Sequence, residues 1–261
     1  MAMIPPPVAL AFCALLGLCV GSFLNVVIAR LPSGRSIAYP GSACPRCGAA
    51  IAWYDNLPVL SYLLLRARCR ACRGAISWRY PMVEIACAGL FTAAYLRFGL
   101  SLQLAAALVL LAVLIAITGI DFDHQIIPDV LSLPGIALGL LLSLGPGGIG
   151  PGDAVLGVLV GGGVFIVIIV GSSLVLGQPG MGAGDAKLGA MLGAFLGWKL
   201  ALLSALMSVL VGGPLAAVLL ATGHKGRKDP LPFGPFLALG GAVSLFWGEA
   251  LLAWYFEQFV G

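Results

Sequence analysis

The sequence has 261 residues, of which 61% are hydrophobic and 9% are charged, with a formal net charge of +4. Because a soluble globular domain carries roughly 25% charged residues, this composition excludes a protein surrounded by water and predicts an integral membrane protein. The excess positive charge lies in polar loops between apolar segments, so no nucleic-acid partner is expected.

The first apolar segment covers residues 7–29. It is long enough to cross the hydrocarbon core of a bilayer, which takes about 20 residues in a helix. No basic residue precedes it and an arginine follows it, which is the reverse of a secretory signal peptide, so we expect an uncleaved membrane helix. Unpaired backbone groups are costly in lipid, and the apolar runs are too continuous for barrel strands. Every span is therefore predicted to be helical.

A polar segment at about residues 30–80 follows and contains two Cys-x-x-Cys pairs, Cys44/Cys47 and Cys69/Cys72, with 21 residues between them. Four thiolates at this spacing are typical of a tetrahedral zinc site, and the flanking arginines favour ionised sulfurs. Two redox dithiols, or thiols without a metal, are the alternatives. A site closed by four cysteines has no open position for water, so we expect this zinc to be structural and to brace a small domain.

Two apolar segments, 81–98 and 101–120, lead into a first acidic cluster at residues 121–129, with the sequence Asp-Phe-Asp-His-Gln-Ile-Ile-Pro-Asp. Charged side chains inside a bilayer are costly and often mark functional sites, although the cost is smaller at the end of a span. Asp123, His124 and Asp129 are therefore equally consistent with a solvated loop.

The segments 130–144 and 154–176 precede a second cluster, in which Asp185 follows three alternating glycines and Lys187 comes two residues later. Glycine has no side chain, so a substrate backbone can approach Asp185 closely. Two carboxyls that lie close together do not both ionise readily. Pairing Asp185 with an aspartate of the first cluster therefore gives aspartic-protease chemistry, in which one carboxylate takes a proton from water while the protonated partner polarises the scissile carbonyl.

The last apolar segments are 186–198, 200–222 and 233–256, which bring the total to eight. With eight spans, twelve of the fourteen Lys and Arg residues fall on one side of the membrane, including those of the 30–80 segment and the 223–230 loop. An excess of basic residues marks the cytoplasmic side. We expect the cysteine segment and both acidic clusters there, and both termini in the periplasm.

Other chemistries fit the sequence less well. The chain has two histidines, His124 and His224, and no His-Glu-x-x-His pattern for a zinc protease. It also has no Gly-x-Ser-x-Gly turn for a serine hydrolase. A transporter that uses interfacial aspartates as proton or cation ligands is the alternative from another class, but it leaves the cysteine segment unexplained.

Several motifs, in this order along the chain, resemble those of bacterial type IV prepilin peptidases, which are membrane aspartyl proteases of the GxGD type. They are residues 21–32 (GSFLNVVIARLP), the two cysteine pairs, residues 56–58 and 60–61 between these pairs, residues 76–81 with Glu84, residues 121–129 and residues 180–188. The resemblance covers most of the chain.

This resemblance implies a function and a set of site residues. The first catalytic aspartate is Asp121 rather than Asp123, because in the family it lies seven residues before the proline of the Pro-Asp pair, here Pro128. The second is Asp185. The expected reaction removes the basic leader of type IV prepilins and pseudopilins after a glycine, at the cytoplasmic face of the inner membrane.

Family members with the cysteine segment resemble the bifunctional class, which also methylates the new N-terminal amine with S-adenosylmethionine; a peptidase without methyltransferase activity is the alternative. The sequence has no Gly-x-Gly-x-x-Gly nucleotide turn, so we assign no residues to the methyl-donor site and expect it between the cytoplasmic domain and the membrane face.

The overall expectation is an all-α polytopic membrane protein with about eight transmembrane helices. Its predicted parts are a first transmembrane helix (1–29), a cytoplasmic four-cysteine zinc domain (30–80) and a transmembrane aspartyl protease core of about seven helices (81–261).

Overall fold

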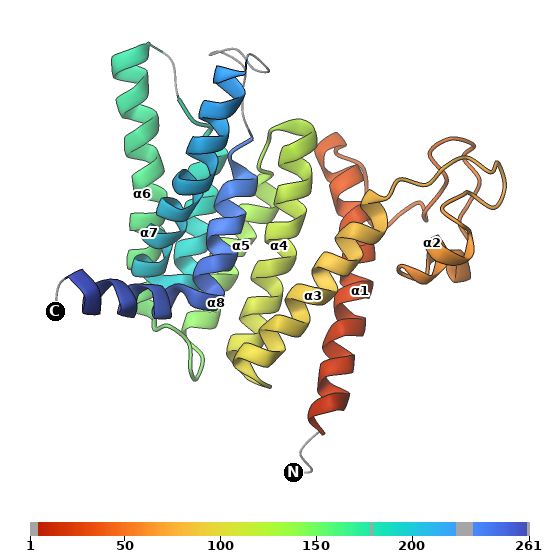
Figure 1. Cartoon of the computed structure of the whole chain (residues 1–261), viewed down its shortest axis with the longest axis horizontal. Helices are drawn as coiled ribbons and strands as arrows, with labels where there is room; N and C mark the ends of the chain where they lie inside the picture. Colours follow the sequence, from red (N-terminus) through yellow and green to blue (C-terminus); the bar gives the residue numbers. More distant parts are fainter. Residues whose placement is uncertain (1–4, 178–179, 223–231, 260–261) are drawn as a thin grey trace. The chain divides into compact units, whose positions relative to one another are not determined.

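The computed structural model describes residues 5–177, 180–222 and 232–259. Within these ranges all regular elements are helices, and bridge pairing is confined to two isolated contacts in the cysteine segment. The long helices are α1 (Pro6–Arg30), α3 (Arg79–Phe98), α4 (Leu102–His124), α5 (Asp129–Ser143), α6 (Pro151–Leu176), α7 (Ala183–Ala221) and α8 (Gly234–Phe259) (Figure 1). Shorter ones are η1 (Leu31–Ser33), η2 (Trp53–Asn56) and α2 (Leu60–Leu64).

Five of the described helices, α1, α4, α6, α7 and α8, are long and apolar enough to cross a membrane, and α5 is a shorter apolar helix. Each predicted apolar segment coincides with a helix or with one arm of α7. Large apolar side chains point outward on these helices; Leu174 and Val175 of α6, for example, are each 82% exposed. Such a surface suits lipid rather than water. The predicted all-helical, multi-pass membrane fold is therefore confirmed.

The chain forms two compact units, Met1–Leu104 and Ala105–Gly261. In the first unit α1 and α3 lie side by side (Figure 1). Their close approach depends on small residues in α1, because a Cβ atom at Gly17 would lie 2.5 Å from the Cα of Ala88, and one at Gly21 would lie 2.6 Å from the Cα of Glu84. Helix α3 therefore belongs to the same compact unit as α1. The sequence analysis had placed it with the protease core at residues 81–261.

In the second unit α7 packs against α5, α6 and α8. The contact with α6 is a stripe of glycines, in which Gly193 meets the backbone of Gly157 and Gly189 meets that of Gly161, the small-residue packing typical of membrane helices. Around it lies a core of buried apolar side chains, among them Leu110, Ile117, Phe165, Leu188, Met191, Leu192 and Leu237. This core fixes the ends of α4, α7 and α8 relative to one another.

Helix α7 contains the boundary between two predicted spans. Its helical path is broken at Gly197, which has φ +79° and ψ 171°, values open to glycine and strained for other residues. The predicted segments 186–198 and 200–222 therefore lie on the two sides of this break. The basic loop at 223–230, which entered the prediction of sidedness, lies outside the described residues.

Candidate active site and metal site

Asp121 lies in the last turn of α4 and is only 4% exposed. Its Oδ2 atom accepts a hydrogen bond of 2.9 Å from the backbone N–H of Gly234, the first residue of α8. The first N–H groups of a helix have no partner within the helix, and the helix dipole favours negative charge at that end. The start of α8 is therefore a natural partner for the Asp121 carboxylate.

The backbone turns sharply just after Asp121. Gln125 adopts φ +55° and its N–H donates to the carbonyl of Asp121, which ends α4, and Pro128 then caps α5. Asp123 and His124 are exposed in this turn. The structure thus separates the two aspartates of the motif, burying one and leaving the other at the surface.

Asp185 lies in the first turn of α7 and is 8% exposed. Its Oδ2 accepts a 3.1 Å hydrogen bond from the N–H of Gly182, while its own N–H donates to the carbonyl of Gly182. The side chain of the third helical residue thus reaches back to the N–H of the N-cap residue, as the acidic partner of a capping box does. Gly180 is held in turn, because its N–H donates to Ser172 Oγ of α6 at 2.8 Å. The glycine loop is therefore a defined structure that orients Asp185.

Asp121 and Asp185 belong to two segments of the second unit that are far apart in sequence and pack on each other. A Cβ atom at Gly184 would lie 2.9 Å from the Cβ of Ile127, so the segment that follows Asp121 packs directly on the glycine loop. The result is a pair of buried carboxyl groups, each held by a backbone N–H.

Asp129 and Lys187 form a separate ion pair with an Nζ–Oδ1 distance of 2.6 Å. It joins the first residue of α5 to α7 two residues beyond Asp185. The side chains are 56% and 36% exposed. Exposed pairs of this kind contribute about 0–1 kcal/mol, so we read this one as a surface contact between the two motifs.

Gly234→Ala provides a direct test of how Asp121 is held. The added Cβ atom would lie 2.7 Å from Asp121 Oδ2, so the carboxyl group has to move. A shift of 1 Å at a catalytic group can lower the rate about 100-fold, and we expect a loss of that order in peptide-bond cleavage. Gly163→Ala in α6 is the matched control, because its Cβ atom would meet nothing within 4 Å. Equal rates for the two variants would contradict this role of Gly234.

The four predicted cysteines converge in the first unit. Their Sγ atoms all lie within 4.8 Å of one another, and Cys44 Sγ and Cys72 Sγ are 3.9 Å apart. A tetrahedral zinc with Zn–S bonds of about 2.3 Å separates its sulfurs by about 3.8 Å. The cluster could therefore hold a metal ion of this kind with little rearrangement.

Each cysteine pair lies in the same local turn. The N–H of the first cysteine donates to a carbonyl five residues on, as Cys44 does to Ala49 and Cys69 to Gly74, and the backbone is closed by an isolated bridge. Backbone N–H groups of Cys47 and Arg46 lower the pKa of the Cys44 thiol to about 6. The donors that favour this thiolate are thus backbone amides, a contribution additional to the expected effect of the arginines.

Some residues of these sites were not predicted. Gly234 and Ser172 lie 113 and 13 positions from the aspartates that they help to hold. The Gly-Pro pair at the start of the last span was a usable signal for Gly234, since such pairs are typical of helix N-termini. Ser172 had no such sequence signal, because a serine inside an apolar helix has many possible hydrogen-bond partners.

Comparison with known proteins gives the same picture across the chain. Residues 15–98 match the bacterial peptidase A24 N-terminal domain, and residues 108–217 match the type IV leader peptidase family. Three similar proteins are each named prepilin leader peptidase/N-methyltransferase. That of Myxococcus xanthus is 46% identical over 224 residues, covering 85% of this chain and 67% of the relative. Those of Stutzerimonas stutzeri and Pseudomonas aeruginosa are each 40% identical, covering 96% and 98% of this chain and 95% and 96% of the relatives.

No solved structure matches significantly. The relatives nevertheless span nearly the whole chain at an identity well above the level of chance, and the two matched domains contain both cysteine pairs and both buried aspartates. The resemblance inferred from the motifs is confirmed, and the chain belongs to the type IV leader peptidase family.

Proposed function

We propose that this enzyme removes the leader peptide of type IV prepilins and pseudopilins, with Asp121 and Asp185 as the catalytic pair, and then methylates the new N-terminal amine. The observation that carries the proposal is that two buried carboxyl groups, from α4 and α7, lie beside segments that pack on each other inside the matched peptidase segment 108–217. The names of the relatives supply the substrate and the second activity.

The geometry supports a two-aspartate mechanism. Each carboxyl group uses Oδ2 to accept a backbone N–H, from Gly234 or Gly182, which leaves Oδ1 for water or substrate. Like charges at short range disfavour double ionisation, so the pair shares one proton. The ionised member takes a proton from water as the oxygen attacks the scissile carbonyl, and the protonated member donates to the carbonyl oxygen. The tetrahedral intermediate then collapses as its nitrogen receives a proton and the C–N bond breaks.

The substrate fits this position at the ends of helices. Asp121 lies in the last turn of α4 and Asp185 in the first turn of α7, so the pair lies where an apolar span meets the interface. A prepilin whose apolar segment lies in lipid presents the junction with its basic leader at this level. Among the glycines before Asp185, Gly182 has open space around it, because a Cβ atom there would meet nothing closer than 3.6 Å, so a substrate backbone can approach at this position. We place this face and the cysteine segment on the cytoplasmic side of the inner membrane, and both termini in the periplasm.

The cysteine cluster and the second activity involve groups bound by the first unit. Cys44, Cys47, Cys69 and Cys72 would hold a zinc ion by four thiolates, which closes the site and leaves a structural role. S-adenosylmethionine, when bound, supplies the methyl group. The residues of this chain have to bind it and admit the pilin amine.

Co-expression of the chain with a candidate prepilin tests the proposal. The intact mass of the pilin should fall by the mass of the leader and rise by one methyl substitution on the new N-terminus. A pilin that is cleaved but unmodified would identify a peptidase without methyltransferase activity. An intact prepilin in membranes containing the enzyme would contradict the proposal as a whole.

A further inference from the structure

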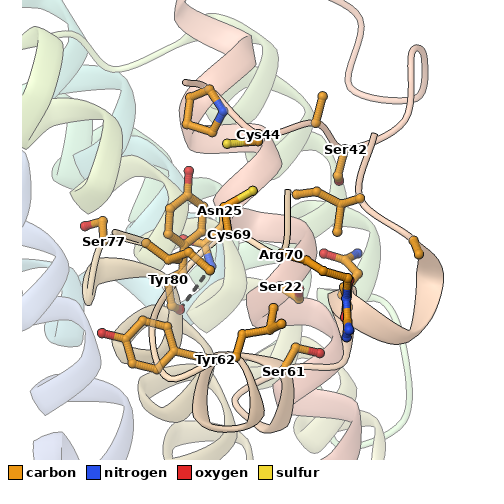
Figure 2. A pocket seen from close by; sticks show the side chains of 18 of the residues that line it. Ser22, Asn25, Ser42, Cys44, Ser61, Tyr62, Cys69, Arg70, Ser77 and Tyr80 are labelled. Atoms are coloured by element: carbon orange, nitrogen blue, oxygen red, sulfur yellow. Dashed lines mark hydrogen bonds and ion pairs between the residues drawn. The ribbon is translucent and has the colours of Figure 1, made fainter. Parts of the chain in front are cut away.

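The first unit contains a cavity of about 580 Å³ that the peptidase chemistry does not use. It is lined by the end of α1, the start of α3 and the cysteine segment. Figure 2 looks into it, with Ser42 and Cys44 above and Ser61 and Tyr62 below, and with the hydrogen bond from Asn25 Nδ2 to the carbonyl of Tyr80 marked. Its volume is within the usual range for small-molecule sites, about 300–1,000 Å³.

Glu84 of α3 lines this cavity and is only 7% exposed. Its Oε2 accepts a 2.7 Å hydrogen bond from the N–H of Val59, and the Ser22 hydroxyl lies beside the same carboxyl group. Within the described part of the chain, no lysine or arginine forms an ion pair with Glu84. A buried carboxyl group without a counter-charge favours its neutral form, and a positively charged ligand in the cavity would stabilise the ionised form.

Val59, the residue that Glu84 holds, has a strained backbone. Its φ of +60° is the left-handed region, which a β-branched residue rarely adopts. Strained backbone conformations of this kind gather at binding and catalytic sites. The hydrogen bond from the Val59 N–H fixes one carboxyl oxygen of Glu84, so this side chain is held in the wall of the cavity.

Three arginines, Arg30, Arg46 and Arg70, also line the cavity. Arg30 is engaged with the carbonyls of Ser36, Pro40 and Gly41, and Arg70 forms a two-pronged ion pair with Asp55. Arg46 also lines the cavity, and no carboxylate of the described residues pairs with it. The cavity lining thus includes one buried carboxyl group without a counter-charge and one exposed guanidinium group outside any described ion pair, together with tyrosines such as Tyr62 and Tyr80.

We propose that this cavity binds S-adenosylmethionine, with Glu84 facing the positive charge of the ligand and Arg46 binding its carboxylate. The ligand has a sulfonium and an ammonium group for Glu84, a carboxylate for Arg46 and an adenine ring that suits aromatic walls. A basic leader peptide would satisfy Glu84 but would be repelled by Arg46. The inference rests on the proposed methyltransferase function and assigns residues to it.

The test is binding of S-adenosylmethionine to the purified full chain in detergent, by isothermal titration calorimetry, with prepilin cleavage measured in parallel. Glu84→Gln removes the charge but keeps an oxygen that can accept the Val59 N–H, so the fold should persist. We expect about a tenfold or greater loss of affinity, as for other charged hydrogen bonds, loss of methylation, and cleavage within about twofold of the wild type. Glu257→Gln, the same change at an exposed site of α8, is the control.

Arg46→Gln provides a second variant, because Arg46 is exposed and lies outside the helices, and glutamine keeps the backbone N–H that bonds to the Cys44 thiol. It should also weaken binding about tenfold. Wild-type affinity in both variants, with a wild-type enzyme that methylates, would overturn this inference alone. A wild-type enzyme that neither binds the ligand nor methylates pilin would overturn the methyltransferase proposal with it. Unchanged affinity in Glu84→Gln with lost cleavage would assign the carboxylate to the leader and also overturn the inference.

Discussion

Asp185→Asn should abolish prepilin cleavage while the protein accumulates normally in membranes. The amide has the shape of the carboxyl group, and its oxygen can still accept the N–H of Gly182 that caps α7. It cannot exchange a proton with water. Loss of a general acid–base group costs about 10²- to 10⁴-fold in rate, and we expect a decrease at or beyond the upper end. The measurement is a time course of leader removal in detergent, normalised to enzyme quantity.

Asp129→Asn is the matched control for this variant. Asp129 is 56% exposed and pairs with Lys187 on the same helix as Asp185. Loss of an exposed ion pair costs about 0–1 kcal/mol, so cleavage should stay within a few-fold of the wild type. If Asp185→Asn retained half of the wild-type rate, or if both variants lost activity equally, the proposed role of Asp185 would be wrong.

Cys47→Ser combined with Cys72→Ser should remove bound zinc and unfold the cysteine segment. Residues 31–78 contain only η1, η2 and α2 as regular elements, and a segment of about 50 residues rarely sustains a core without a metal or disulfides. Structural zinc contributes about 10–16 kcal/mol in small zinc domains. We expect zinc content to fall from one ion per chain to none, protease sensitivity to rise between α1 and α3, and methylation to be lost.

Cleavage should decline less than methylation in this double variant, because both aspartates belong to the other compact unit. Cys19→Ser is the control, since Cys19 is an exposed thiol of α1 outside the cluster. Elemental analysis by mass spectrometry and limited proteolysis measure the effects. A wild-type chain purified without zinc, or a double variant as resistant to protease as the wild type, would contradict the structural role of a metal.

The helices and the two motif sites were predictable from the sequence because they depend on strong local signals. Long apolar runs in a chain with few charges leave helices as the available structure. Two Cys-x-x-Cys pairs constrain each other, and the structure brings all four sulfurs together as expected. The pairing of Asp121 with Asp185 is what the family resemblance implies, and the packing of Ile127 on Gly184 is a physical contact between their two segments.

Other features depend on tertiary contacts that no local pattern carries. Gly197 looks like one of many glycines in the sequence, yet its positive φ breaks the helical path between two predicted spans. Glu84 lies in a motif of the N-terminal domain, but its partner Val59 is 25 residues away. The cavity that they share forms only when the cysteine segment folds against α1 and α3. Its lining is therefore visible in the structure and not in the sequence.

The most direct test of the central claim compares Asp121→Asn with Asp123→Asn, two residues apart in the same motif, by the intact mass of co-expressed prepilin. Asp121 is buried against the start of α8 and Asp123 is exposed. We predict unprocessed prepilin with Asp121→Asn and a fully processed pilin with Asp123→Asn. Complete processing by Asp121→Asn would contradict the two-aspartate site described here.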